Sequence, residues 1–145
     1  RRYATINWAA DYAAIAFAVQ ALLLLAATFG RPTFEVGANV SSLVGLGLLL
    51  FALVLQPLLG PLLGRPWAQV ELFGLTPDPT IVATLGVLLL AARRRHLALT
   101  IIPLLWCAAS AVTLWAMEAA EAWVMIGAGA IAVGTLMSRL SGRHG

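Results

Sequence analysis

The chain has 145 residues, of which 61% are hydrophobic and 10% are charged, and its formal net charge is +3. Soluble domains are about 45–50% apolar and about 25% charged, and disordered chains combine low hydrophobicity with high net charge, so both classes are excluded. The apolar residues form long unbroken runs instead of the alternation typical of a membrane β-barrel. This pattern predicts an all-α integral membrane protein.

Five apolar runs predict one bundle of five transmembrane helices without a separate soluble domain. A helix needs about 20 apolar residues to cross roughly 30 Å of hydrocarbon. The third run reaches only about 25 Å, so it crosses only if the arginines at its end extend to the interface. The predicted spans are about 8–29, 42–63, 79–95, 97–117 and 122–140.

The second predicted span has a clear start and a broken end. Asn39 or Ser41 precedes it, and both residue types are favoured N-caps. Pro57 and Pro61 fall in its last third, so we expect a kink near Gln56.

The stretch between the second and third spans is rich in proline, and we expect an interfacial loop over residues 65–78. It ends in Asp78-Pro79, which is typical of an N-cap followed by proline at the first helical position.

Charge distribution predicts the orientation in the membrane. Alternating spans place three arginines and five acidic residues on the side of the N-terminus, against six arginines and one acidic residue on the other. Arginine in short loops marks the cytoplasm, so we expect a multi-pass protein with its N-terminus outside and its C-terminus cytoplasmic. Four of the five tryptophans fall near the outer side, as an aromatic belt would.

Acidic residues give one candidate site on the outer side, formed by Asp11, Glu71 and Asp78. Carboxylates there could bind a cation or relay protons. The alternative is structural, because Asp78 could simply cap a helix. Asp11 lies about one turn inside the first span, where an ionisable group is expensive.

Two glutamines, Gln20 and Gln56, lie deeper in the predicted spans. An amide in hydrocarbon needs partners, so each could hold helices together or contact a polar solute or a quinone. Pro57 also frees a backbone carbonyl near Leu53, which a neighbouring amide could satisfy. We favour the role of polar glue between helices.

Small residues four apart predict close helix packing, either inside the bundle or against a partner. Gly60 with Gly64 and Ala130 with Gly134 are the pairs of most interest. The last span carries a face of small residues that suits a partner helix, a lipid or a long apolar cofactor.

The sequence offers little support for a catalytic or cofactor-binding site. His96 is a weak candidate for a shared haem or chlorophyll ligand, and an interfacial histidine is the simpler interpretation. The single cysteine excludes a multi-cysteine metal site. The sequence contains no recognised catalytic motif, requires no cofactor and predicts no metal site.

Two elements resemble an uncharacterised family of polytopic bacterial inner-membrane proteins. The first is R-Y-A-T-I-N-W-A at residues 2–9, and the second is L-F-G-L-T-P-D-P-T at residues 72–80. The stretches 51–60 and 84–86 add to the similarity, which covers most of the chain.

The resemblance implies fold and location only, since the family has no assigned activity. Its pattern usually has cysteine between the two prolines, where this chain has Asp78. A thiol role is therefore not expected here. Members of the family carry further apolar spans before the first element, which implies that an N-terminal portion is missing.

Three functions fit these observations unequally. The leading expectation is a non-catalytic accessory subunit that packs against other transmembrane subunits of a larger complex, for example a redox or photosynthetic one. The alternative is a small-solute transporter or channel that uses the proline-broken second helix and the short third helix. An enzyme ranks last, and binding to nucleic acid is not expected.

Overall fold

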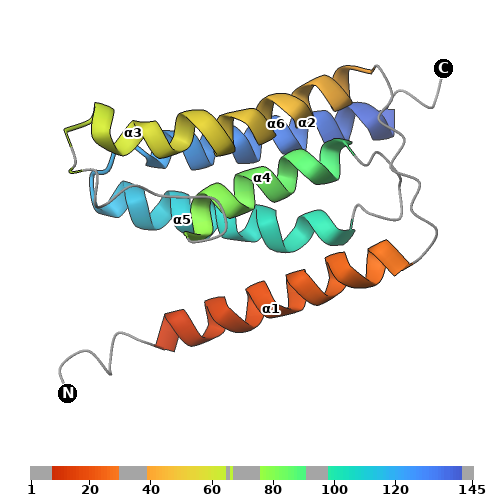
Figure 1. Cartoon of the computed structure of the whole chain (residues 1–145), viewed down its shortest axis with the longest axis horizontal. Helices are drawn as coiled ribbons and strands as arrows, with labels where there is room; N and C mark the ends of the chain where they lie inside the picture. Colours follow the sequence, from red (N-terminus) through yellow and green to blue (C-terminus); the bar gives the residue numbers. More distant parts are fainter. Residues whose placement is uncertain (1–7, 30–38, 65, 67–75, 91–97, 142–145) are drawn as a thin grey trace. The chain divides into compact units, whose positions relative to one another are not determined.

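A computed structural model describes residues 8–29, 39–64, 66, 76–90 and 98–141, and these form helices and turns without any strand. The chain divides into two units, residues 1–33 and 34–145. Figure 1 shows the helices in order along the chain.

The first unit contains α1 (Trp8–Phe29), a single helix of 22 residues. Its alanines and leucines are among the strongest helix formers. Its bounds coincide with the first predicted span.

The second unit begins with one continuous helical rod made of α2 (Val40–Leu50), a π-helix η1 (Phe51–Leu55) and α3 (Gln56–Leu62). Asn39 caps it, because its Oδ1 accepts a hydrogen bond of 2.8 Å from the backbone N–H of Ser42. Of the two predicted caps, Asn39 is therefore the one observed, and Ser41 lies inside the helix. The kink expected near Gln56 takes the form of the π-helix immediately before it.

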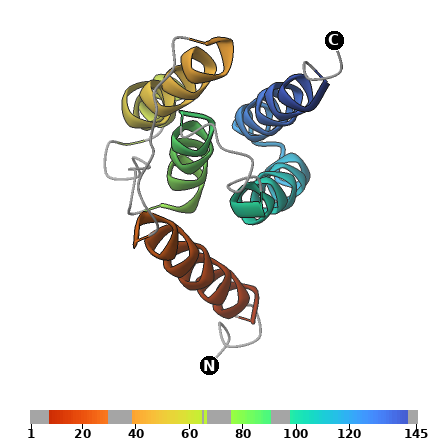
Figure 2. The same cartoon turned by 90° about the vertical axis from the view of Figure 1, so that its right-hand side faces the viewer.

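Helix α4 (Pro77–Leu90) lies at the centre of the second unit, as Figure 2 shows. It packs chiefly against α2 and also contacts α5, α6 and the π-helix. Most of its side chains are buried on all sides of the helix: Pro79, Ile81, Val82, Ala83, Leu85, Gly86, Leu88 and Leu89.

Helices α2 and α4 touch through two glycines. A Cβ atom added at Gly45 would lie 2.6 Å from the backbone oxygen of Gly86, and one at Gly86 would lie 2.7 Å from the oxygen of Gly45. Only residues without a side chain permit this backbone approach, which fixes where the two antiparallel helices cross.

Helices α5 (Ile101–Ala116) and α6 (Ala122–Ser141) form an antiparallel hairpin. The turn is a Schellman motif, with backbone bonds from Glu118 to Trp115 and from Ala119 to Leu114. Glu118 takes the left-handed conformation, with φ 56°, that glycine usually occupies there. Trp115 and Trp123 meet edge to face across the hairpin, with ring centroids 5.2 Å apart.

Three helices are long and apolar enough to cross a membrane: Val40–Leu62, Ala98–Ala116 and Ala122–Ser141. The segments Ala14–Ala27 and Pro77–Leu90 are shorter apolar helices. Large apolar side chains, such as Leu105, Val112 and Met137, are widely exposed on the helix surfaces. A helical bundle with an apolar exterior is what a lipid environment requires.

Candidate functional site

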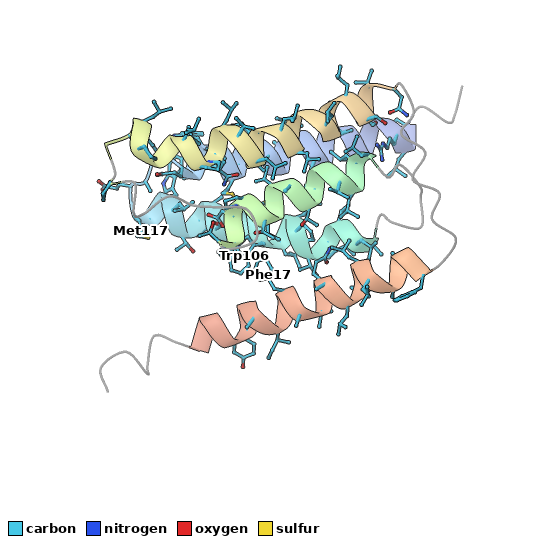
Figure 3. All side chains as sticks on the ribbon, viewed as in Figure 1. Phe17, Trp106 and Met117 are labelled. Atoms are coloured by element: carbon cyan, nitrogen blue, oxygen red, sulfur yellow. The ribbon has the colours of Figure 1, made fainter. Side chains whose placement is uncertain are left out.

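Asp78 joins two helices through its carboxylate. Trp106 Nε1 donates to Oδ1 at 2.9 Å, and Ser110 Oγ donates to Oδ2 at 2.8 Å. The donors are four residues apart and therefore share one face of α5. Figure 3 labels Trp106. The helix begins at Pro77, so Asp78 stands inside the first turn and its carboxylate faces α5, which differs from the predicted cap.

The two donors stabilise a charge that is partly withdrawn from solvent. Hydrogen bonds to an ionised acceptor are stronger than those between neutral groups, and a partly buried carboxylate needs them. The hydroxyls of α4 need no such partner, since Thr80 Oγ1 donates to the carbonyl of Thr76 and Thr84 Oγ1 to that of Thr80, both at 2.7 Å. Asp78 therefore links α4 to α5 through two side-chain hydrogen bonds.

Gln56 lies on the buried face of its helical rod and is only 6% exposed. Gly45, Leu48 and Ala52 occupy the same face, which packs against α4. Its Oε1 has no hydrogen-bond partner among the described residues. We expected Gln56 to hold helices together through hydrogen bonds, but its Oε1 makes none with the described residues.

The register of the two helices sets the height of Gln56 along α4. Gly45 lies against the segment from Gly86 to Leu90, and Gln56 follows Gly45 by eleven residues. Eleven residues back along the antiparallel α4 lies its first turn, at residues 77–79. Gln56 is therefore level with the first turn of α4, where Asp78 lies.

A second feature is an apolar groove of about 580 Å³ between α2 and α6. Gly47 and Gly127 stand on its two walls, and neither has any atom within 4 Å of an added Cβ. We call it the α2–α6 groove, and it is lined by Val44, Gly47, Leu48, Phe51, Trp123, Val124, Gly127, Ala128 and Ile131.

The small-residue pairs have different places. Ala130 is exposed, and Gly134 has open space around it, so this pair continues the accessible side of α6. Gly60 lies within α3 and is partly exposed. Gly64 follows the end of α3 with φ +87° and no neighbour within 4 Å, so it serves the helix end instead of a helix contact.

The remaining candidates are not brought to Asp78 by any described contact. Gln20 lies on α1, in the other unit. Asp11 also belongs to α1, but its side chain lies outside the described residues, as do Glu71 and His96. Within the described part of the chain, no three His, Cys, Asp or Glu side chains gather as a metal site.

Sequence reasoning missed the two donors to Asp78. Trp106 and Ser110 are 28 and 32 residues from it, and only the packing of α5 on α4 brings them together. One signal was available, namely that an indole and a hydroxyl share a face of an otherwise apolar helix at a spacing of four residues.

A model for a family of unknown function (DUF6064) matches residues 3–143 of the chain. Searches of curated proteins and of solved structures found no match.

Proposed function

The chain belongs to the DUF6064 family of unknown function, and we propose that it is a non-catalytic membrane protein that packs against other transmembrane subunits as an accessory subunit. Its contacts lie within the bilayer. Neither nucleic acid nor a cofactor has a part in this role.

The observation that carries the proposal is the α2–α6 groove. Lipid tails are as apolar as leucine, so helices in a membrane associate through close packing at small residues and not through burial of apolar surface. The groove offers Gly47 and Gly127 at its walls, and Gly134 lies two helical turns beyond Gly127 on the same face of α6. A partner helix can approach the backbone closely there.

We place the protein in the bacterial inner membrane with its C-terminus in the cytoplasm. The described charges support this orientation. Asp78 and Glu118 lie at one end of the second unit, and Arg139 at the other. Arg139 donates to the carbonyl of Leu89 in the last turn of α4, a favourable place for a cation.

The test is the native mass of the protein extracted from its own membrane in a mild detergent, compared with the same measurement on Gly127→Leu. We expect a stoichiometric assembly that Gly127→Leu disrupts by filling the groove. The melting temperature of the isolated chain should not fall, because the leucine extends into the open groove from a Cβ with no atom within 4 Å, and leucine favours a helix more than glycine does. Ala108→Leu also introduces a leucine, at an exposed position of α5 outside the groove, and should keep the assembly.

A wild-type chain that migrates alone, or an assembly that tolerates Gly127→Leu and Ala108→Leu equally, contradicts the proposal. In the second case the chain has partner subunits, but they do not bind at the groove.

A second candidate function, a small-solute transporter, is favoured by the π-helix beside Gln56 and the polar contacts of Asp78. Irregular helices near a buried polar group recur at transport sites, and π-helical turns recur at functional sites. Cells that express the chain should then take up a solute, and Asp78→Ala and Gln56→Ala should each abolish that uptake.

A further inference from the structure

We propose that Asp78 and Gln56 bind a small monovalent cation between the first turn of α4 and the π-helical segment of the neighbouring rod. The site does not include the α2–α6 groove, so it stands whether or not the chain has a subunit partner.

Asp78 supplies the negative charge. Each carboxylate oxygen can accept more than one hydrogen bond, and the structure gives each oxygen one donor, Trp106 for Oδ1 and Ser110 for Oδ2. The donors hold the carboxylate in a fixed orientation and leave lone pairs for a ligand. A carboxylate in this state attracts a cation and repels an anion.

Gln56 supplies a neutral oxygen. Its side chain is 94% buried, and Oε1 has no hydrogen-bond partner in the described part of the chain. A buried acceptor without a partner destabilises the fold, so binding of a donor or a cation at this oxygen is favourable. Its place on the rod face toward α4, level with residues 77–79, puts it at the same height along α4 as Asp78.

The backbone of the π-helix supplies a third oxygen. The N–H of Gln56 bonds to the carbonyl of Phe51, and the next residue, Pro57, has no N–H. A carbonyl at Ala52 or Leu53, one turn earlier, therefore loses its donor. Freed backbone carbonyls of this kind coordinate Na⁺ in membrane proteins with interrupted helices.

The charge of the site selects the class of cation. One carboxylate with two neutral oxygens balances a single positive charge, whereas Ca²⁺ sites commonly use several carboxylates. No cluster of three His, Cys, Asp or Glu occurs within the described ranges, so a transition metal has no ligand set among them. Na⁺ is accordingly the probe of choice, with K⁺ as its size variant.

The experiment measures thermal unfolding of the full chain in detergent, in NaCl and in choline chloride at equal ionic strength. A ligand that binds only the folded state raises the melting temperature with concentration. We expect a saturable rise of several degrees in Na⁺ that choline, which is too large for the site, does not give.

Gln56→Leu is the decisive variant. It removes the unpaired oxygen and keeps the volume, so it should abolish the response to Na⁺ while leaving the melting temperature in choline equal or higher. Ser42→Ala is the matched control, because Ser42 Oγ is also buried without a hydrogen-bond partner but lies at the opposite end of α2. This control should retain the full response.

Trp106 gives a second readout that does not depend on a variant of the binding oxygens. Its indole donates to Asp78, so Na⁺ should change its fluorescence, and Trp106→Phe should remove that change. A wild-type chain whose melting temperature and Trp106 emission are the same in Na⁺, K⁺ and choline overturns the proposal. So does an undiminished response in Gln56→Leu, or a response to Ca²⁺ alone.

Discussion

Gly45 and Gly86 let two backbones approach more closely than any pair of side chains would allow. Each glycine has the carbonyl oxygen of the other within 3 Å of where its Cβ would stand. These neighbours are backbone atoms, which cannot move aside as the end of a flexible side chain can. The crossing of α2 and α4 therefore depends on both residues.

Gly86→Ala should destabilise the folded chain by about 1–3 kcal/mol, the usual effect of overpacking a tight contact. Thermal unfolding in detergent measures the change. Gly47→Ala is the control on the partner helix, since nothing lies within 4 Å of its added Cβ. It should be neutral or slightly stabilising because alanine favours the helix. Equal melting temperatures for the two variants would refute the importance of the crossing.

Single residues were predictable where their effect is local. Asn39 was one of two predicted caps, and its side chain accepts a hydrogen bond from the backbone three residues ahead. Asp78 was singled out, but its donors were not, because they depend on how α5 rotates against α4. The glycine contact was missed for the same reason, as Gly45 and Gly86 belong to different helices and are 41 residues apart.

The π-helix Phe51–Leu55 is the irregular element of the second unit. In a π-turn each backbone hydrogen bond spans five residues instead of four, which widens the helix. The wider turn accommodates a position that has no N–H donor. It lies directly before Gln56 and Pro57, so the proline and the widened turn are two parts of one local structure.

Pro57→Ala restores a backbone donor to this turn. It should raise the melting temperature in choline and weaken the response to Na⁺, because the freed carbonyl regains a partner. Pro61→Ala, one turn later, removes a proline from α3 without touching the π-helix, so it should stabilise the chain and leave the Na⁺ response intact. A Pro57→Ala protein with the full Na⁺ response would exclude the backbone oxygen from the site.

Helix positions were predictable from the sequence to within a few residues, because caps, glycines and prolines mark most ends of the apolar runs. The start of α2 at Val40, directly after Asn39, and the end of α1 at Phe29, directly before Gly30, illustrate this. The type of helix at Phe51–Leu55 was not predictable. Proline predicts that the helix is distorted. It does not predict the kind of distortion, because a kink, a break and a π-turn can each accommodate the missing hydrogen bond.

The second unit as a whole runs up and down through its helices, so successive connections lie at opposite ends. Described acidic residues gather at the end that holds Asp78 and Glu118, and Arg139 lies at the other. Such an asymmetry is the physical basis of the proposed orientation.

Single cysteines test this orientation in a Cys107→Ser background. Ala120→Cys lies in the exposed turn between α5 and α6, and Ser141→Cys at the exposed end of α6. A membrane-impermeant maleimide should label Ala120→Cys in intact cells and Ser141→Cys only after the membrane is opened. The reverse pattern would invert the proposed topology.

The sequence predicts how many apolar helices exist but not which one is central. Helix α4 is apolar around its whole circumference, so no single face of it predicts a neighbour. Its centre position follows from the glycine crossing and from its contacts with α2, α5 and α6.

The enclosure of α4 also bears on how the chain is made. Eight of its fourteen residues are buried by protein, so α4 gains most of its native surroundings from neighbouring helices and not from lipid. Its main neighbour, α2, precedes it in the chain and is synthesised first. Gly45 of α2, which contacts Gly86, has therefore been synthesised before α4 leaves the ribosome. The order of translation matches the order in which the two helices can pack.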